Sequence, residues 1–217
     1  MMMKAAIFDL DGTLLDSMGI WNDAGKRYLH SIGVEPEENL SIILFPMTME
    51  VGARYVKEHY HLQQTEGQIM DGVLGIVRNF YYEEVQAKEG AKEFLERLSK
   101  QGIPMAAATA GNRELAERAL MRLGIRSYFK EILTCTEVGA GKHEPDIYQK
   151  ALEILGSVPE ETYVFEDAFY ALETAKKAGF RTVGVEDDSS LRDRMQIRQI
   201  ADQYLSSWKE AVGILDE

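Results

Sequence analysis

Two aspartates stand one residue apart, directly after a short apolar run near the start of the chain. The run covers residues 5 to 8 (Ala-Ala-Ile-Phe), and Asp9 and Asp11 follow it, with Gly12 beside them. Its length and composition predict a buried strand. The carboxyl ends of strands in an open parallel sheet border the crevice where ligands bind, so both carboxylates are expected at a ligand site.

The two carboxylates suit different chemistry. Asp9 is placed to act as a nucleophile or as a ligand of a hard metal ion. Asp11 can serve as general acid and base if burial or a neighbouring negative charge raises its pKa. The alternative is an ordinary Asp-Gly turn with solvated acids. The combination of Asp9, Asp11, Gly12 and Thr13 behind an apolar strand favours a functional site.

Polar groups also follow two later strands. Thr109, Ala110 and Gly111 come after the apolar run 103–108, where a hydroxyl and backbone amides near a helix start can cradle phosphate oxygens. The alternative is that Thr109 or Asn112 only caps the next helix. Lys142 follows a third strand in a segment that lacks the pattern of a P-loop, and a solvated surface lysine is its alternative interpretation.

Glu166 and Asp167 end a fourth strand, and they bring two more acids to the same edge of the sheet. Four carboxylates there would repel one another unless a cation holds them together, and Mg²⁺ is the natural choice for a set of oxygen ligands. The alternative is the usual enrichment of acids at a helix N-terminus.

The segment D-L-D-G-T-L-L-D-S resembles the first motif of the haloacid dehalogenase-like hydrolase superfamily. The resemblance implies that Asp9 is the nucleophile that becomes aspartyl-phosphate and that Asp11 is the acid/base, with Mg²⁺ between them. True dehalogenases of the superfamily lack the second Asp, so its presence points to phosphoryl transfer.

The later motifs resemble the same family in the same order. Thr109 matches the residue that binds the phosphoryl group, and Lys142 in G-K-H-E-P-D-I-Y matches the lysine that neutralises charge. The resemblance implies a metal ligand at Asp167, with Glu166 beside it as a further ligand or supporting group. Ala168 and Ala171 stand where the family usually has Ser and Gly.

Residues 16–86 show helical patterns and no convincing strand, which predicts a small helical unit inserted after the first strand. The expected core therefore comprises residues 1–15 and 87–217. The insertion resembles the first type of cap of the family, as in the β-phosphoglucomutase-like and phosphoglycolate-phosphatase-like members, and it would act as a lid.

The rest of the chain alternates strand and helix, which predicts an α/β fold with a doubly wound parallel sheet, the Rossmann-like core of the family. We expect these elements: strand 103–108, helix 112–123, strand 131–135, helix 146–155, strand 163–165, helix 168–177 and strand 182–185. Glycines at 102, 124, 156 and 179 are expected to end the helices before them.

The leading functional hypothesis is a Mg²⁺-dependent phosphatase of a small phosphorylated metabolite. A sugar-phosphate mutase is the first alternative, but such mutases carry a His where this chain has Trp21, and a Lys and Arg where it has Phe45 and Met49. Trp21 and Phe45 are instead candidate substrate contacts, although packing within the cap is the more common role of such residues. A non-catalytic phosphate-binding protein is a second alternative, suggested by Ala168 and Ala171.

The composition of the chain limits the kinds of molecule that the protein is expected to bind. A formal charge of −12 argues against non-specific binding to nucleic acid. No run approaches the roughly 18 apolar residues of a membrane span, so we expect no membrane association. The single cysteine, Cys135, excludes an internal disulfide and is expected to be a buried thiol, which favours a cytoplasmic protein. A monomer is the simpler expectation.

Overall fold

A computed structural model describes residues 3–215 of the chain and divides it into two compact units. The core unit comprises the residues up to Ser17 and those from Val85 onward, and the helical unit is Met18–Glu84. These boundaries lie two residues inside the expected insertion on each side. The reason is local pairing within the core unit, because Asp16 N donates to Gln86 O at 3.0 Å and Leu15 forms an antiparallel bridge with Ala87.

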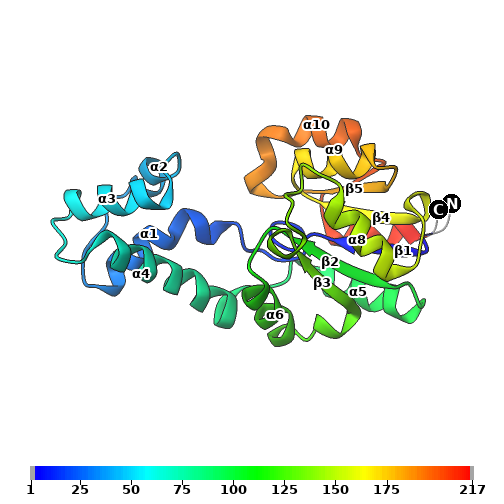
Figure 1. Ribbon diagram of the computed structural model, residues 1–217, viewed down its shortest axis with the longest axis horizontal. Helices are drawn as coiled ribbons and strands as arrows, with labels where there is room; N and C mark the ends of the chain where they lie inside the picture. The colour runs from blue at the N-terminus through cyan, green and yellow to red at the C-terminus, as the bar shows by residue number, and fades with distance from the viewer. Residues whose placement is uncertain (1–2, 216–217) are drawn as a thin grey trace. The chain divides into compact units, whose positions relative to one another are not determined.

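The core unit is built on a sheet of six parallel strands, in the order β3-β2-β1-β4-β5-β6 (Figure 1). The expected α/β fold with a doubly wound parallel sheet is confirmed. The strands are β1 (Ala5–Phe8), β2 (Met105–Thr109), β3 (Phe129–Thr134), β4 (Thr162–Glu166), β5 (Arg181–Val185) and β6 (Gln203–Leu205). Since β1 lies between β2 and β4, the residues that follow these three strands meet at one edge of the sheet.

Helices connect the strands of the core unit. They are α5 (Ala91–Lys100), α6 (Arg113–Arg122), α7 (Cys135–Val138), α8 (Asp146–Leu155), α9 (Phe169–Lys177) and α10 (Arg194–Ile200), with short 3-10 turns at Arg126–Tyr128, Pro159–Glu161, Asp188–Asp193 and Trp208–Leu215. The predicted glycine stops at 102, 124, 156 and 179 are confirmed, since all four have positive φ. This left-handed backbone is most accessible to glycine.

An aromatic cluster packs at the carboxyl-terminal ends of β1 and β4. Phe8 on β1 stacks on Phe165 of β4 at 4.5 Å between ring centroids, and Phe94 meets both rings edge-on. Trp208 packs against all three, and its Nε1 donates to Thr13 O at 3.0 Å. Trp208 is therefore a packing residue, and the cluster holds the loop after β1 in place.

The helical unit contains α1 (Gly19–Ser31), α2 (Leu40–Leu44), α3 (Met49–His59) and α4 (Glu66–Asn79), and α4 continues into a π-helical turn at Phe80–Glu84. Its own apolar core includes Tyr28, Leu29, Leu40, Val56 and Ile69. Thr65 begins α4 with a capping box, in which Gln68 N donates to its hydroxyl and Gln68 Oε1 accepts from its backbone N–H. The insertion therefore has a hydrophobic core of its own.

Helix α1 begins at Gly19 without a side-chain cap, and the Ser17 hydroxyl donates to Asp11. The sequence-based expectations for Cys135 and for the end of β3 were wrong. Cys135 is partly exposed and starts α7, since β3 ends at Thr134, whose hydroxyl caps that helix. Strand β6 was not expected at all.

Within residues 3–215, no helix is long and apolar enough to cross a membrane.

Candidate active site

Asp9 and Asp11 follow β1 at the centre of the sheet, and their side chains face different partners. Asp9 is buried, and its backbone N–H donates to Phe165 O at 3.0 Å. Asp11 accepts a hydrogen bond of 2.7 Å from Ser17 Oγ. Gly12 forms the turn after Asp11 with a φ of 83°, and it lies against the loop that follows β4. A Cβ on Gly12 would lie 2.7 Å from Asp167 Oδ2. A glycine is therefore required for the two loops to approach this closely.

Three carboxylates converge at the ends of β1 and β4. One oxygen from each of Asp9, Glu166 and Asp167 lies within 4.8 Å of the others, and all three residues are buried. Asp167 also accepts from Thr13 Oγ1 at 2.9 Å. The Asp11 carboxylate, expected to share in the metal site, is not part of this group. The structure thus brings together three of the four acids predicted to hold a metal.

Lys142 supplies the positive charge of the site. Its Nζ donates to Asp9 Oδ1 and, at 2.8 Å, to Glu166 Oε2. Only 4% of the residue is exposed, so the interpretation as a solvated surface lysine was wrong. Burial opposes the ammonium charge, but the carboxylates of Asp9 and Glu166 outweigh it and hold the pKa of Lys142 well above its usual value. Lys142 therefore stays charged beside Asp9.

One lysine does not neutralise the three acids. Burial and the charge of Asp9 raise the pKa of Glu166 to about 7, and burial with the charges of Asp9 and Glu166 raises the pKa of Asp167 well above its usual range. Both shifts have the same two causes, burial of the carboxylates and the negative charge of their neighbours. Because the donors are oxygen atoms only, the group fits a hard divalent cation such as Mg²⁺.

The loop after β2 lies beside Asp11. Thr109 is buried, and its hydroxyl accepts from Gly111 N at 2.8 Å. A Cβ on Gly111 would lie 2.9 Å from Asp11 Oδ2, so this loop also approaches the acids closely. Asn112 caps α6 by accepting from Glu114 N and Leu115 N. Capping therefore belongs to Asn112, and Thr109 lies with Asp11 and Gly111 at the sheet edge.

Comparison with known proteins now decides the family. The model of the family described as haloacid dehalogenase-like hydrolase matches residues 6–185, a range that contains every acid of the site and Lys142. The chain belongs to the haloacid dehalogenase-like hydrolases. The expected family membership is confirmed, and the protein is a hydrolase of this family.

Individual relatives of this hydrolase cover nearly its whole length. It is 30% identical to a phosphorylated carbohydrates phosphatase of Thermotoga maritima over 99% of both chains, and 29% identical to hexitol phosphatase A of Escherichia coli K12 over 85% of this chain and 84% of that one. A Thermotoga maritima crystal structure described provisionally as a beta-phosphoglucomutase matches with a TM-score of 0.85 at 28% identity, covering 99% of each chain.

Three residues support the site through hydrogen bonds that were not predicted from the sequence of this hydrolase. Thr13 binds Asp167, Ser17 binds Asp11, and the Tyr148 hydroxyl lies 3.3 Å from Glu166 Oε2. Thr13 and Ser17 belong to the first motif, so the sequence indicated that they lie near the site. It did not indicate which residues they would hydrogen-bond. Tyr148 belongs to α8 and has the pattern of an ordinary apolar position of an amphipathic helix.

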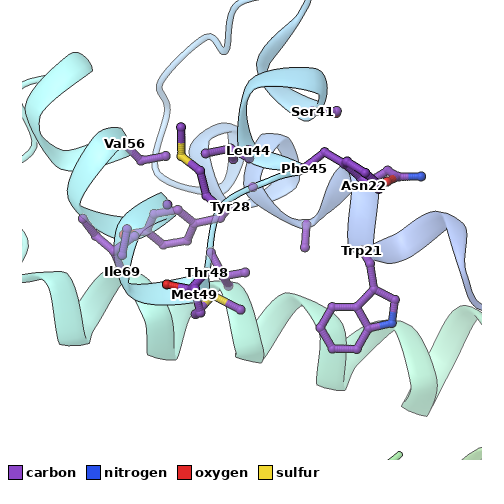
Figure 2. Close-up of a pocket in the computed structure, with 16 residues that line it drawn as sticks. Trp21, Asn22, Tyr28, Ser41, Leu44, Phe45, Thr48, Met49, Val56 and Ile69 are labelled. Atoms are coloured by element: carbon purple, nitrogen blue, oxygen red, sulfur yellow. The ribbon is translucent and has the colours of Figure 1, made fainter.

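The two positions that depart from the family pattern lie beside Glu166 and Tyr148. Ala168 leaves α9 without a side-chain cap, while its backbone N–H lies 3.4 Å from Glu166 Oε1. Ala171 is fully buried, and its carbonyl oxygen lies 3.4 Å from the Tyr148 hydroxyl. Trp21 and Phe45, the candidate substrate contacts, lie in the helical unit and line a pocket there (Figure 2).

Proposed function

We propose that this hydrolase is a Mg²⁺-dependent phosphatase that cleaves a small phosphomonoester through an aspartyl-phosphate on Asp9. The observation that carries the proposal is the arrangement around Asp9, where a buried carboxylate is paired with Lys142 and grouped with two further acids. A carboxylate held in this way is oriented for attack, and the surrounding groups can stabilise negative charge on a transferring phosphoryl group.

In the proposed first step, a carboxylate oxygen of Asp9 attacks phosphorus while the bond from phosphorus to the ester oxygen breaks. Asp11 gives its proton to the departing oxygen, and Ser17, 2.7 Å away, keeps the Asp11 carboxyl in position. In the second step, Asp11 takes a proton from water as the water attacks the aspartyl-phosphate. Inorganic phosphate leaves, and Asp9 is regenerated.

The remaining residues bind and neutralise the phosphoryl oxygens. Lys142 offers a fixed positive charge, and Thr109 with the backbone around Ala110 and Gly111 offers hydrogen-bond donors. We propose that Asp9, Glu166 and Asp167 hold Mg²⁺, with Asp11 contributing from the adjacent position. A bound Mg²⁺ would supply further charge neutralisation for the phosphoryl group.

The substrate proposed here is a small phosphorylated metabolite, bound by a monomer in the cytoplasm. Support for this class comes from the relatives named as phosphatases of phosphorylated carbohydrates and of hexitols. Trp21 and Phe45 are proposed contacts to the part of the substrate that carries no phosphate. Their side chains are 50% and 71% exposed, so both are available to a ligand.

The test is phosphate release from p-nitrophenyl phosphate, with and without Mg²⁺, by the wild-type protein and by Asp9→Asn. We expect metal-dependent release that falls by at least about 10³-fold in the variant, since Asn cannot act as the nucleophile. Circular dichroism and thermal unfolding would show that the variant is folded. Turnover retained by folded Asp9→Asn would refute the assignment.

A sugar-phosphate mutase is the second candidate, because the Thermotoga maritima structure with a TM-score of 0.85 is described provisionally as a beta-phosphoglucomutase. A mutase must hold a second phosphate, and Trp21, Phe45 and Met49 offer no cation for it. Incubation with a sugar 1-phosphate separates the two functions. Free phosphate supports the phosphatase, and an isomerised sugar phosphate stimulated by a bisphosphate supports the mutase.

A further inference from the structure

Tyr148 is buried in the apolar core, and its hydroxyl group reaches the candidate active site. It lies in α8, only 1% of the residue is exposed, and its ring packs against Phe180 with 6.1 Å between the ring centroids. The hydroxyl lies 3.3 Å from Glu166 Oε2 and 3.4 Å from Ala171 O. A phenylalanine would serve the packing equally well, and a buried hydroxyl is costly unless it is hydrogen-bonded. The role of this hydroxyl therefore lies in its partners.

The Tyr148 hydroxyl has one proton and two possible acceptors. Ala171 lies within α9, where a carbonyl oxygen normally accepts from the N–H of the residue four positions later. Glu166 Oε2 instead belongs to a carboxyl group that faces the ammonium of Lys142 at 2.8 Å. Hydrogen bonds to an ionised acceptor are about twice as strong as bonds between neutral groups. Donation from Tyr148 to Glu166 is therefore the favoured arrangement.

Glu166 Oε2 is shared by two donors that come from one short segment of the chain. Lys142 precedes α8, and Tyr148 lies in the first turn of that helix. The other carboxylate oxygen, Oε1, lies 3.4 Å from Ala168 N. Both oxygens of Glu166 are thus held, and the carboxylate cannot rotate without losing one of these contacts.

The position of Glu166 decides where the ammonium group of Lys142 points. A lysine has a flexible stem and three N–H donors at its tip, so its acceptors determine its orientation. Lys142 Nζ donates to Asp9 Oδ1 and to Glu166 Oε2, which uses two of the three donors. The tetrahedral geometry of the ammonium then fixes the direction of the third. This N–H is left for an oxygen of a phosphoryl group in front of Asp9.

We propose that Tyr148 is a positioning residue that acts through Glu166 on Lys142. Its hydroxyl holds Glu166 Oε2, and Glu166 in turn holds Lys142 Nζ. The remaining N–H of Lys142 is thereby directed at the phosphoryl group. The effect on turnover rests on the proposed phosphatase function, whereas the orientation of the Lys142 ammonium does not.

Tyr148→Phe removes the hydroxyl and keeps the ring. Tyr204→Phe is the matched control, because the Tyr204 hydroxyl donates to Glu186 Oε2 at 2.9 Å, outside the group of site acids. Both variants lose one hydrogen bond from a tyrosine to a glutamate in the core unit, so urea unfolding should show a similar, small loss of stability. If Tyr148 served stability alone, the two variants would behave alike in every other measurement.

The first measurement is the ammonium signal of Lys142 in a proton–nitrogen correlation NMR spectrum of the full-length protein, assigned by its loss in Lys142→Arg. A buried ammonium group that carboxylates hold in place exchanges its protons slowly with water and gives a resolved signal. We expect this signal in the wild type and in Tyr204→Phe, and we expect it to shift or broaden in Tyr148→Phe. An unchanged signal in folded Tyr148→Phe overturns the proposal, as does a wild type without a resolved signal.

The second measurement is a double-mutant cycle in the turnover of p-nitrophenyl phosphate with Mg²⁺. We expect Tyr148→Phe to lower kcat about ten-fold and to change KM less than about two-fold, since an oriented N–H matters most as charge develops in the transition state. Tyr204→Phe should change neither constant by more than about two-fold.

The Glu166→Ala background shows whether Tyr148 acts through Glu166. There, Tyr148→Phe should lower kcat less than about two-fold, because the carboxylate that transmits its effect is absent. An equal loss in both backgrounds overturns the proposal. Absence of turnover in the wild type would refute the phosphatase, and the ammonium signal of Lys142 would still decide the role of Tyr148.

Discussion

At Gly12 the site leaves no room for a side chain. Its φ of 83° lies in the left-handed region, and an added Cβ would lie 2.7 Å from an oxygen of Asp167. Asp167 cannot retreat freely, because Thr13 holds its other oxygen at 2.9 Å. Gly12 therefore determines both the turn after β1 and the distance between Asp9 and Asp167.

Gly12→Ala is expected to lower the free energy of unfolding by about 2 kcal/mol, from the strained φ and the displaced carboxylate together. It should also weaken Mg²⁺ binding, because Asp167 must move away from Asp9. Urea unfolding and Mg²⁺ titration measure the two effects. Gly19→Ala is the control, since a Cβ there meets nothing within 4 Å and its φ is not positive. Equal behaviour of the two variants would contradict this account.

The sequence indicated charged residues at strand ends, and the structure brings Asp9, Lys142, Glu166 and Asp167 together, whereas the hydrogen bonds that support them were not predicted. Asp9, Lys142 and Asp167 stand in motifs at strand ends, where residue type and position both carry information. The bond from Thr13 to Asp167 joins residues 154 positions apart, and its geometry depends on how the two loops fold. Hydroxyl groups have many local partners, so sequence alone did not select the distant one.

At the scale of elements, the short strand β6 shows a similar limit. It has only three residues and lies at the edge of the sheet beside β5, with one buried side chain, Leu205. Such a strand has too little apolar alternation to be recognised. The inner strands were predicted because their side chains are buried on both faces and their apolar runs are continuous.

The segment that returns from the helical unit is anchored by Lys88. Its Nζ lies 2.8 Å from Asp187 Oδ2 and donates to Glu186 O at 2.7 Å, while its backbone N–H donates to Leu14 O. The Asp187 side chain is only 7% exposed. Although burial opposes ionisation, hydrogen bonds from Lys88 and Ser189 lower the pKa of Asp187 below its usual value.

Asp187→Asn is expected to cost about 1–3 kcal/mol of unfolding free energy at neutral pH, because it removes the partner of the Lys88–Asp187 ion pair. The folded-state pKa of Asp187 is depressed, so its contribution is fully present above the unfolded value of about 3.9 and is lost as pH falls through the folded value. The gap between wild type and variant should therefore shrink on acidification from about pH 5.

Urea unfolding at a series of pH values tests this expectation. Asp188→Asn provides the matched control, because Asp188 is the exposed neighbour and the substitution changes net charge by the same amount. A gap that stays constant from neutral pH to about pH 3 would show that the Asp187 carboxylate does not stabilise the fold through its charge.

At the scale of the whole molecule, the site gathers negative charge on buried carboxylates that the rest of the fold does not neutralise. The chain has a formal charge of −12. Within residues 3–215, Lys142 is the one positively charged residue that hydrogen-bonds to the buried carboxylates of Asp9, Glu166 and Asp167. Burial and like charge both disfavour the ionised acids. Without a cation, the proposed catalytic site should therefore reduce the stability of the protein.

Asp167→Asn tests this cost. Because the folded-state pKa of Asp167 is raised above the unfolded value of about 3.9, the wild type in EDTA should lose stability as pH rises above that value, and the variant should lose less. We expect the variant to be more stable by about 1–2 kcal/mol near pH 8, since Asn can still accept from Thr13.

Mg²⁺ at about one hundred times its Kd should raise the wild-type melting temperature by about 5–10 °C and leave the melting temperature of Asp167→Asn unchanged. Glu160→Gln, at an exposed position, controls for net charge. A variant less stable than wild type in EDTA, or one with an undiminished response to Mg²⁺, would mean that Asp167 serves the fold rather than a metal.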